Sequence, residues 1–167
     1  MMTREETWAR LVQHGIEKGK MPLDKRWDLT DKVLMNADLS NTNLSDVELF
    51  RSNLNFTNFS NADLSGAALI EAYATGANFS GANLSNANLM KASLPRSNFQ
   101  SADLRGADLR KADLFEANLS EANLEGAKLK GADLSEANLE GAKLKGVDLS
   151  RANLTGAKIN STGDCKS

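Results

Sequence analysis

The sequence contains very little of what most catalytic and metal-binding sites require. Its 167 residues include one cysteine, one histidine and two prolines, and aromatic residues make up only 5%. A single cysteine, Cys165, cannot form an internal disulfide, and the single histidine, His14, cannot belong to a histidine cluster. We therefore expect no metal site, no cofactor and no nucleophile with a catalytic base beside it.

An excess of charge of one sign is also missing. Twenty Lys and Arg residues offset 22 Asp and Glu residues, which leaves a net charge of −2. This balance argues against the basic surface that direct nucleic-acid binding requires. No apolar run approaches the roughly 18 residues that cross a membrane, and the N-terminus lacks the apolar core of a signal peptide. These absences predict a cytoplasmic protein that binds neither nucleic acid directly nor membranes.

A five-residue repeat fills most of the chain. From Leu29 to Ile159 there are 27 positions spaced by five, and 26 of them are Leu, Phe or Ile; the exception is Ala74. Two residues before these positions, Ala fills 19 of 26 sites, and the residue between is mostly Asp or Asn. The repeating unit is therefore A-(D/N)-L-x-x.

A period of five fits no amphipathic helix, because apolar residues at i and i+5 would drift around the helix surface. Within each unit the Ala and the Leu are two residues apart, as on one face of a strand. The three-residue step to the next Ala breaks this alternation, so a corner must lie there. Gly occupies the second corner position nine times, where it can supply a positive φ. Each unit is thus predicted to form one side of a coil, with Ala and Leu inward.

The spacing of rarer residues indicates four sides per coil. Phe59, Phe79 and Phe99 lie 20 residues apart and would form one internal column. A coil of 15 residues would instead bring like charges opposite each other, which is unfavourable. At a spacing of 20, three sets of charged residues alternate in sign: Asp31–Arg51–Glu71–Lys91, Arg105–Glu125–Lys145 and Asp108–Lys128–Asp148.

The tandem units, such as ADLSG at 62–66 and ANLSN at 82–86, resemble those of the pentapeptide repeat family. The resemblance implies an all-β fold, a right-handed four-sided parallel β-helix with about 20 residues per coil and nearly seven coils at this length. We expect this β-helix over residues 27–160 and a flexible C-terminal tail over 161–167.

Residues 1–26 lack the repeat and are expected to form an N-terminal helical cap, because an open β-helix end exposes backbone edges and apolar side chains. Thr3 to Glu6 matches a capping box and predicts a short helix over residues 4–18. The apolar stripe of this helix, together with Trp27, would cover the first coil. The stripe comprises Trp8, Leu11, Val12 and Ile16.

The C-terminus has no comparable lid, so the last coil is either poorly covered or pairs with a second copy. We therefore expect either a monomer or an end-to-end homodimer. Inside the repeat, Ala74 stands where Leu is expected and Tyr73 where Asp or Asn is expected. These departures predict a local bulge or packing defect around Ala72–Ala74.

The many Asp and Asn residues nearly all occupy one outward position beside a corner, where they tolerate unusual backbone angles. We interpret them as structural rather than catalytic. Carboxylate stacks such as Asp113 over Asp133 lack the closed ligand shell that specific calcium binding needs.

One outward column is apolar and lies beside a column of alternating charge. An apolar strip next to charged residues is typical of a protein-docking surface. The other interpretation is that these apolar residues only pair across strands or lie partly beneath the N-terminal segment. The candidate docking stripe comprises Phe50, Ile70 and Met90 with the adjacent Arg51, Glu71 and Lys91.

The sequence thus predicts a non-enzymatic protein–protein interaction or regulatory scaffold module with an unidentified protein partner. The resemblance offers an alternative, because some members of the family mimic DNA and bind DNA gyrase. Four lysines, Lys128, Lys130, Lys143 and Lys145, interrupt the acidic face that such mimicry needs. The partner, the pathway and the oligomeric state stay open.

Overall fold

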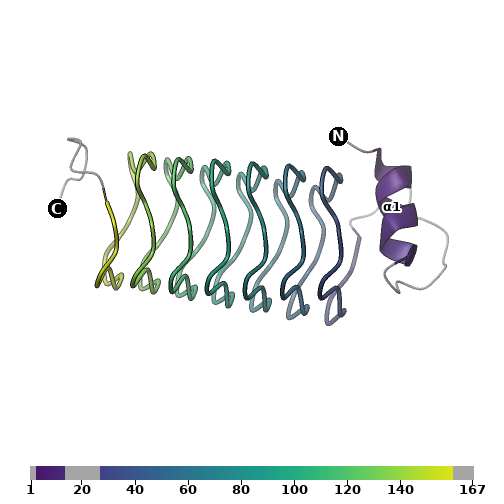
Figure 1. The fold of residues 1–167 in the computed structure, drawn as a ribbon, viewed down its shortest axis with the longest axis horizontal. Coiled ribbons are helices and arrows are strands. Elements are labelled where there is room, and N and C mark those ends of the chain that lie inside the picture. Colours follow the sequence, from purple (N-terminus) through teal and green to yellow (C-terminus); the bar gives the residue numbers. More distant parts are fainter. Residues whose placement is uncertain (1–2, 14–26, 160–167) are drawn as a thin grey trace.

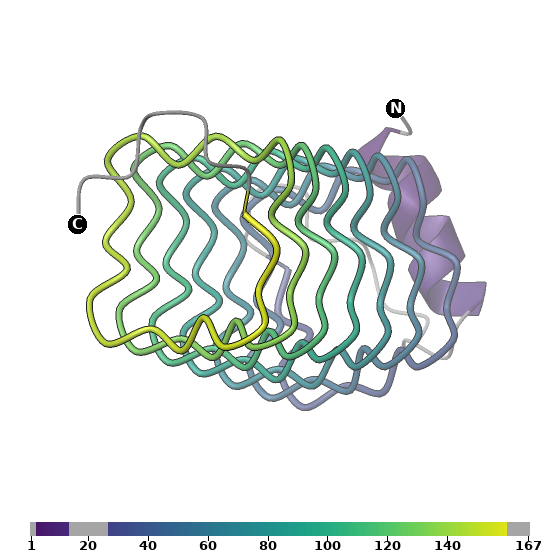
Figure 2. The same cartoon turned by 60° about the vertical axis from the view of Figure 1, so that its left-hand side comes forward.

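The computed structural model describes residues 3–13 and 27–159, in which one helix is followed by a long coil (Figure 1). Helix α1 spans Arg4–Gln13. In the coil, outward residues pair in parallel with the residue 20 positions later, from Asp28 with Glu48 to Asn138 with Lys158. This is the spacing predicted from the phenylalanines, and Figure 2 shows successive coils lying in register.

Several predictions fall on residues 14–26 and 160–167 and lie outside the described residues. They include the extension of the helix to residue 18 and the C-terminal tail 161–167. The same holds for the side chains of Trp8, His14, Ile16 and Cys165.

Each turn of the coil has four sides and four corners, numbered along the chain. Each side is three residues long, each corner is two residues long, and all of them recur every 20 residues. Sides 1 to 4 begin the coil at 27–29, 32–34, 37–39 and 42–44. Corners 1 to 4 come after them at 30–31, 35–36, 40–41 and 45–46.

Each side is bonded to the coils before and after it. On side 4, the amide of Leu64 donates to the carbonyl of Asn83 at 2.7 Å, and the amide of Asp63 donates to that of Thr42 at 2.9 Å. Ala62 and Leu64 are completely buried, whereas Asp63 between them is partly exposed. The predicted inward and outward positions are therefore confirmed for this side, and the same alternation runs through the coil.

Each corner is a tight turn with a positive φ at its second residue. At corner 4, the amide of Ala67 donates to the carbonyl of Leu64 at 3.0 Å, and Gly66 has a φ of 67°. This combination is typical of a type II turn. Where a corner lacks Gly, a non-Gly residue adopts the same conformation, with φ between 52° at Arg51 and 61° at Asn36. The corner geometry is thus imposed by the coil even where a side chain makes it unfavourable.

The core is a set of stacked columns. The rings of Phe59, Phe79 and Phe99 are fully buried, with centroids 5.1 and 4.8 Å apart and nearly parallel planes. The predicted phenylalanine column is confirmed. Where Ser or Thr replaces the inward Ala, the hydroxyl donates to a backbone carbonyl, as from Ser52 to Leu29 at 2.7 Å.

Helix α1 lies across the N-terminal end of the coil (Figures 1 and 2). The predicted capping box is confirmed: the amide of Glu6 donates to Thr3 Oγ1 at 3.2 Å, and the amide of Thr3 donates to Glu6 Oε2 at 2.8 Å. Leu11 is buried against the core. Thr7 Oγ1 accepts the amide of Asn43 at 3.0 Å, a contact that the apolar stripe does not predict.

The bulge expected around Ala72–Ala74 is wrong. Tyr73 pairs in parallel with Asn53 and Ser93, and the amide of Ala74 donates to the carbonyl of Ser93 at 2.7 Å. The backbone keeps its register because the ladder bonds do not depend on the volume of the inward side chain. Ala74 itself is completely buried.

Phe79→Ala should lower the free energy of unfolding by about 3–5 kcal/mol, because it removes a buried ring from between two others. Phe56→Ala is the control, since that ring is 60% exposed. Urea unfolding followed by circular dichroism measures both. Equal losses for the two variants would contradict the stacked core.

Gly126→Ala should cost about 1 kcal/mol through backbone strain alone. Gly126 has a φ of 70°, and an added Cβ would meet no atom within 4 Å. The neighbouring Glu125→Ala serves as a control at a position without positive φ and should change stability by less than about 0.5 kcal/mol. Thermal unfolding distinguishes the two, and an unchanged Gly126→Ala variant would mean that the corner is not strained.

Candidate docking surface

The predicted apolar column lies at corner 1. The amide of Arg51 donates to the carbonyl of Ile70, and that of Glu71 to the carbonyl of Met90, both at 3.1 Å. Phe50, Ile70 and Met90 therefore occupy the same place in successive coils. All three side chains are half-buried rather than fully exposed. Their part in docking stays a prediction.

The charged column beside them forms pairs across coils. Arg51 binds Asp31 through two hydrogen bonds, at 3.0 Å from Nε and 2.9 Å from Nη2. Lys91 Nζ lies 2.9 Å from Glu71 Oε1. The guanidinium carbon of Arg51 also lies 4.7 Å from the ring centroid of Phe50, close enough for a cation–π interaction. Part of the apolar column is thus covered by its charged neighbour.

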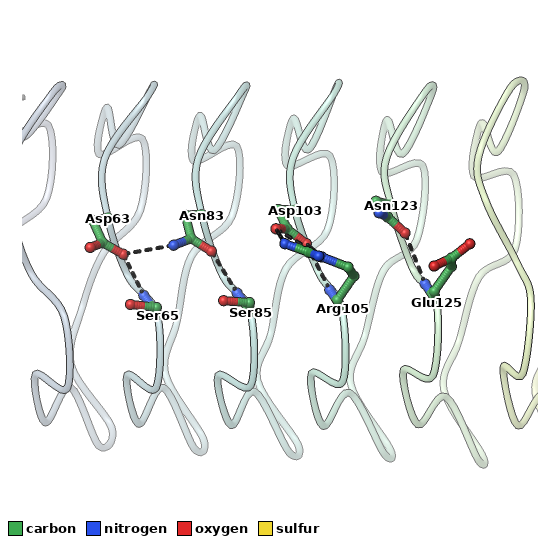
Figure 3. Close-up of polar contacts among 8 residues, drawn as sticks. All are labelled: Asp63, Ser65, Asn83, Ser85, Asp103, Arg105, Asn123 and Glu125. Carbon is green, nitrogen blue, oxygen red and sulfur yellow. Dashed lines mark hydrogen bonds and ion pairs between the residues drawn. The ribbon is translucent and has the colours of Figure 1, made fainter.

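The other two predicted charge ladders pair differently. Arg105 binds Asp103 two residues earlier at 2.5 Å, and Arg110 binds Asp108 at 2.6 Å. Among the described residues, no ion pair joins Arg105 to Glu125. The reason is local, because the amide of Arg105 also donates to Asp103 Oδ1 and holds the two side chains together (Figure 3).

The outward Asp and Asn side chains hold the corners and connect the coils. Asp63 Oδ1 accepts the amide of Ser65 at 3.0 Å and the side-chain amide of Asn83 at 3.0 Å (Figure 3). On side 3 the same cross-coil bond runs through a longer column. That column comprises Asp38, Asn58, Asn78, Asn98 and Asn118. These bonds give the repeated Asp and Asn residues the structural role that was predicted.

Within residues 3–13 and 27–159, no group of three or more His, Cys, Asp or Glu side chains could hold a metal ion. The described part of the chain also contains no helix long and apolar enough to cross a membrane.

The large apolar side chains that are most exposed gather on side 2 and on corner 2, which follows it. The exposed fractions are 66% for Val33, 48% for Met35, 60% for Phe56 and 54% for Tyr73. We call these four residues the apolar face. The signal in the sequence is that Val33 and Tyr73 replace the usual Asp or Asn on the same side, 40 residues apart.

A row of cations continues corner 1 beyond the apolar column. The amide of Lys91 donates to the carbonyl of Arg110 at 3.0 Å, and that of Lys111 to the carbonyl of Lys130 at 3.2 Å. We call this row the basic ridge. It comprises Lys91, Arg110, Lys111, Lys130 and Arg151. The net charge of −2 for the whole chain does not reveal this ridge, because acidic residues elsewhere in the sequence balance its charge.

Asp103 and Asp108 should make stability depend on acidic pH. Hydrogen bonds from the side chains of Arg105 and Arg110 hold the pKa of these carboxyls below the ordinary value of 3.8. A carboxyl with a lowered folded pKa stabilises the fold above its unfolded pKa and loses that contribution as pH falls through the folded pKa. We expect the urea midpoint to be flat above about pH 5 and to fall below about pH 4.

Asp108→Asn should make the fall in urea midpoint shallower, because one of the titrating carboxyls is gone. Glu125→Gln is the control, since Glu125 forms no ion pair among the described residues. If the urea midpoint falls equally steeply below about pH 4 in Asp108→Asn and in the unaltered protein, the ion pair between Arg110 and Asp108 does not have this role.

The five-residue repeat also occurs in known proteins. The family model for pentapeptide repeats matches residues 57–96, 92–131 and 132–162, with 8 copies. No curated protein matches the sequence. Among solved structures, the pentapeptide repeat protein Rfr23 from the cyanobacterium Cyanothece 51142 is 24% identical over 83% of this chain and 91% of its own, with a TM-score of 0.49.

HetL from Nostoc sp. strain PCC 7120, a pentapeptide repeat protein involved in heterocyst differentiation regulation, is 28% identical over 99% of this chain and 100% of its own, with a TM-score of 0.32. QnrB1, a plasmid-mediated fluoroquinolone resistance protein, is 19% identical over 87% of this chain and 88% of its own, with a TM-score of 0.45. Because the family model covers more than half of the chain, the protein belongs to the pentapeptide repeat family, whose members form right-handed quadrilateral β-helices.

Proposed function

We propose that this protein is a non-enzymatic interaction or regulatory scaffold module that docks a protein partner on its outer surface. The observation that carries the proposal is the gathering of exposed large apolar side chains on side 2 and corner 2. Contiguous exposed apolar surface on a folded protein marks interaction sites. The apolar column of the candidate docking stripe borders the other edge of side 2, so the two features adjoin.

The rigidity of the coil supports this function. Sides within the coil are bonded to both neighbouring coils, and the inward columns are buried along most of the described length. A surface that is already ordered loses little conformational entropy when a partner binds. Such a rod can therefore present a fixed pattern of side chains to another protein.

The state of the acidic residues supports a role without catalysis. A general acid needs a carboxyl whose pKa is raised towards neutral pH. Here the hydrogen bond from Ser40 lowers the pKa of Asp38, and that from Ser135 lowers the pKa of Asp133. These groups remain ionised acceptors at neutral pH, which suits turns and coil contacts and does not suit a general acid.

The alternative, a DNA-mimicking modulator of DNA gyrase, is less well supported by the charge pattern. A mimic of duplex DNA needs acidic residues along the length of the rod. The basic ridge instead places cations from Lys91 to Arg151 on corner 1. We place the scaffold function in the cytoplasm, with the protein acting as a monomer or an end-to-end homodimer and without direct contact with nucleic acid or membrane.

The test is affinity capture with cross-linking from the source cells, followed by reconstitution with the purified partner. The bait is compared with a variant that carries Phe50→Glu, Ile70→Glu and Met90→Glu. A partner that binds at corner 1 should be lost, because three half-buried apolar side chains are replaced by charge. We expect at least a tenfold weaker affinity by titration calorimetry, which corresponds to about 1.4 kcal/mol.

A matched control carries Ser60→Glu, Ser80→Glu and Gln100→Glu, which add the same charges at the same positions of corner 3. Both variants must retain the unfolding midpoint of the parent. If all three baits retain one partner, the candidate stripe is wrong and the scaffold function stands. If no bait captures a protein, the proposed scaffold function is wrong. If the parent bait captures gyrase subunits, the DNA-mimicking alternative is favoured.

A further inference from the structure

We infer that the apolar face and the basic ridge form one binding surface for a partner segment that is apolar at one end and rich in carboxylates at the other. This inference rests on the proposed function and adds the chemistry of the partner. The two halves adjoin at Tyr73, which lies on side 2 one coil before Lys91 of corner 1, the edge at which side 2 begins. Met35 and Phe56 lie at the opposite edge of side 2.

The apolar half is not required by the fold. Elsewhere an outward Asp or Asn accepts the amide two residues later, as Asn53 does from Asn55 at 3.2 Å. Tyr73 cannot accept this bond, and the amide of Thr75 donates to Asn55 Oδ1 in the preceding coil at 2.8 Å instead. An Asp or Asn would serve the turn at position 73 directly, so the exposed ring contributes something other than turn geometry.

The ring of Phe56 adds to the same half. It lies over the next coil of corner 2, because a Cβ added to Gly76 would come within 2.8 Å of its Cδ1 and Cε1 atoms. The ring nevertheless remains 60% exposed. A flat aromatic surface of this kind offers contact area at a low cost in side-chain entropy.

The basic half continues the apolar column in a straight line. The first position of corner 1 changes from Met90 to Arg110 and Lys130, and the second position carries Lys91, Lys111 and Arg151. Lys91 and Arg110 pair with acids of their own column or coil. Among the described residues, Lys111, Lys130 and Arg151 have no carboxylate within 4.0 Å.

The width of the ridge favours a single peptide segment over a nucleic acid or an anionic membrane. Acidic side chains flank it on both sides: Asp113 and Asp133 stack on side 2, and Asp108 and Asp148 lie on side 1 with Lys128 between them. A duplex or a bilayer would bring its phosphates over these acids and be repelled. A narrow segment with carboxylates can contact the cations and avoid the flanks.

The length of the surface sets the length of the partner segment. Coils lie about 4.8 Å apart, so the ridge from Lys91 to Arg151 is about 15 Å long. An extended chain rises about 3.3 Å per residue, so about five residues cover it. The apolar face spans two coils from Val33 to Tyr73, about 10 Å, and one further coil separates Tyr73 from Lys91. A segment of about ten residues therefore fits the whole surface.

The direct test uses three fluorescein-labelled peptides of about ten residues and fluorescence anisotropy with the full-length protein. The parent peptide alternates Leu and Phe with Ser in one half and carries Asp and Glu in the other. One comparison peptide replaces the acids by Lys, and the other replaces Leu and Phe by Ser. We expect the parent to bind at least about tenfold more tightly than either and to weaken as salt rises.

Matched variants locate the binding site. Lys111→Glu with Arg151→Glu should weaken the parent peptide about tenfold, and so should Phe56→Ser with Tyr73→Ser. Lys143→Glu with Lys145→Glu makes the same change in net charge on side 4 and corner 4 and should change binding less than about twofold. All substituted side chains are outward, so the unfolding midpoints should stay close to that of the parent.

Three results would overturn the inference: no binding of the parent peptide, equal binding of the Lys peptide, or equal loss in the ridge variant and its charge-matched control. Displacement of the peptide by a 20-base-pair DNA duplex at lower concentration would assign the ridge to nucleic acid instead. Concentration-dependent sedimentation abolished by Phe56→Ser with Tyr73→Ser would assign the face to a second copy. Failure of the peptide while affinity capture still yields a partner leaves the scaffold function intact and rejects only this surface.

Discussion

The backbone ladder between residues 20 positions apart is the constraint on which the rest of this structure depends. Each side donates to and accepts from both neighbouring coils through its backbone, so the register does not depend on individual side chains. Every residue of the coil consequently stacks on the residue 20 positions away. Side chains of one kind that recur at this spacing therefore form a column along the coil. The phenylalanine stack, the asparagine ladder and the basic ridge all result from this one periodicity.

A column in which the same residue type recurs favours side chains that can both donate and accept a hydrogen bond. An Asn can accept from the coil after it and donate to the coil before it, so the column from Asn58 to Asn118 extends without charge. An Asp can only accept. In these cross-coil bonds it lies at the lower-numbered position, as Asp38 does below Asn58 and Asp63 below Asn83. The frequent Asn and the placement of Asp thus have a common origin in hydrogen-bond direction.

The columns could be predicted from the sequence, whereas contacts around a corner could not. Spacing alone predicts the four sides, the buried Phe59–Phe79 stack and the pairing of Arg51 with Asp31. It fails for Arg105, because the turn after Asp103 holds these two side chains together within one coil. It also fails at Ala74, where volume suggests a bulge but the ladder keeps the register. The spacing argument does not reveal the apolar face, because its members lie in three neighbouring columns of side 2 and corner 2 and not in one.

A fold this regular has little room for a site made by an internal cleft, since its interior is filled by columns of Ala and Leu. Features specific to this protein therefore lie at the outward positions, where a substitution changes the surface without changing the register. The amide of Thr75 illustrates this freedom, because Asn55 supplies the acceptor that Tyr73 cannot. Departures from the repeat at outward positions therefore change the free energy of unfolding little and are accessible to a binding partner. Where several departures adjoin, as around corner 1 and side 2, recognition explains them better than the requirements of the coil.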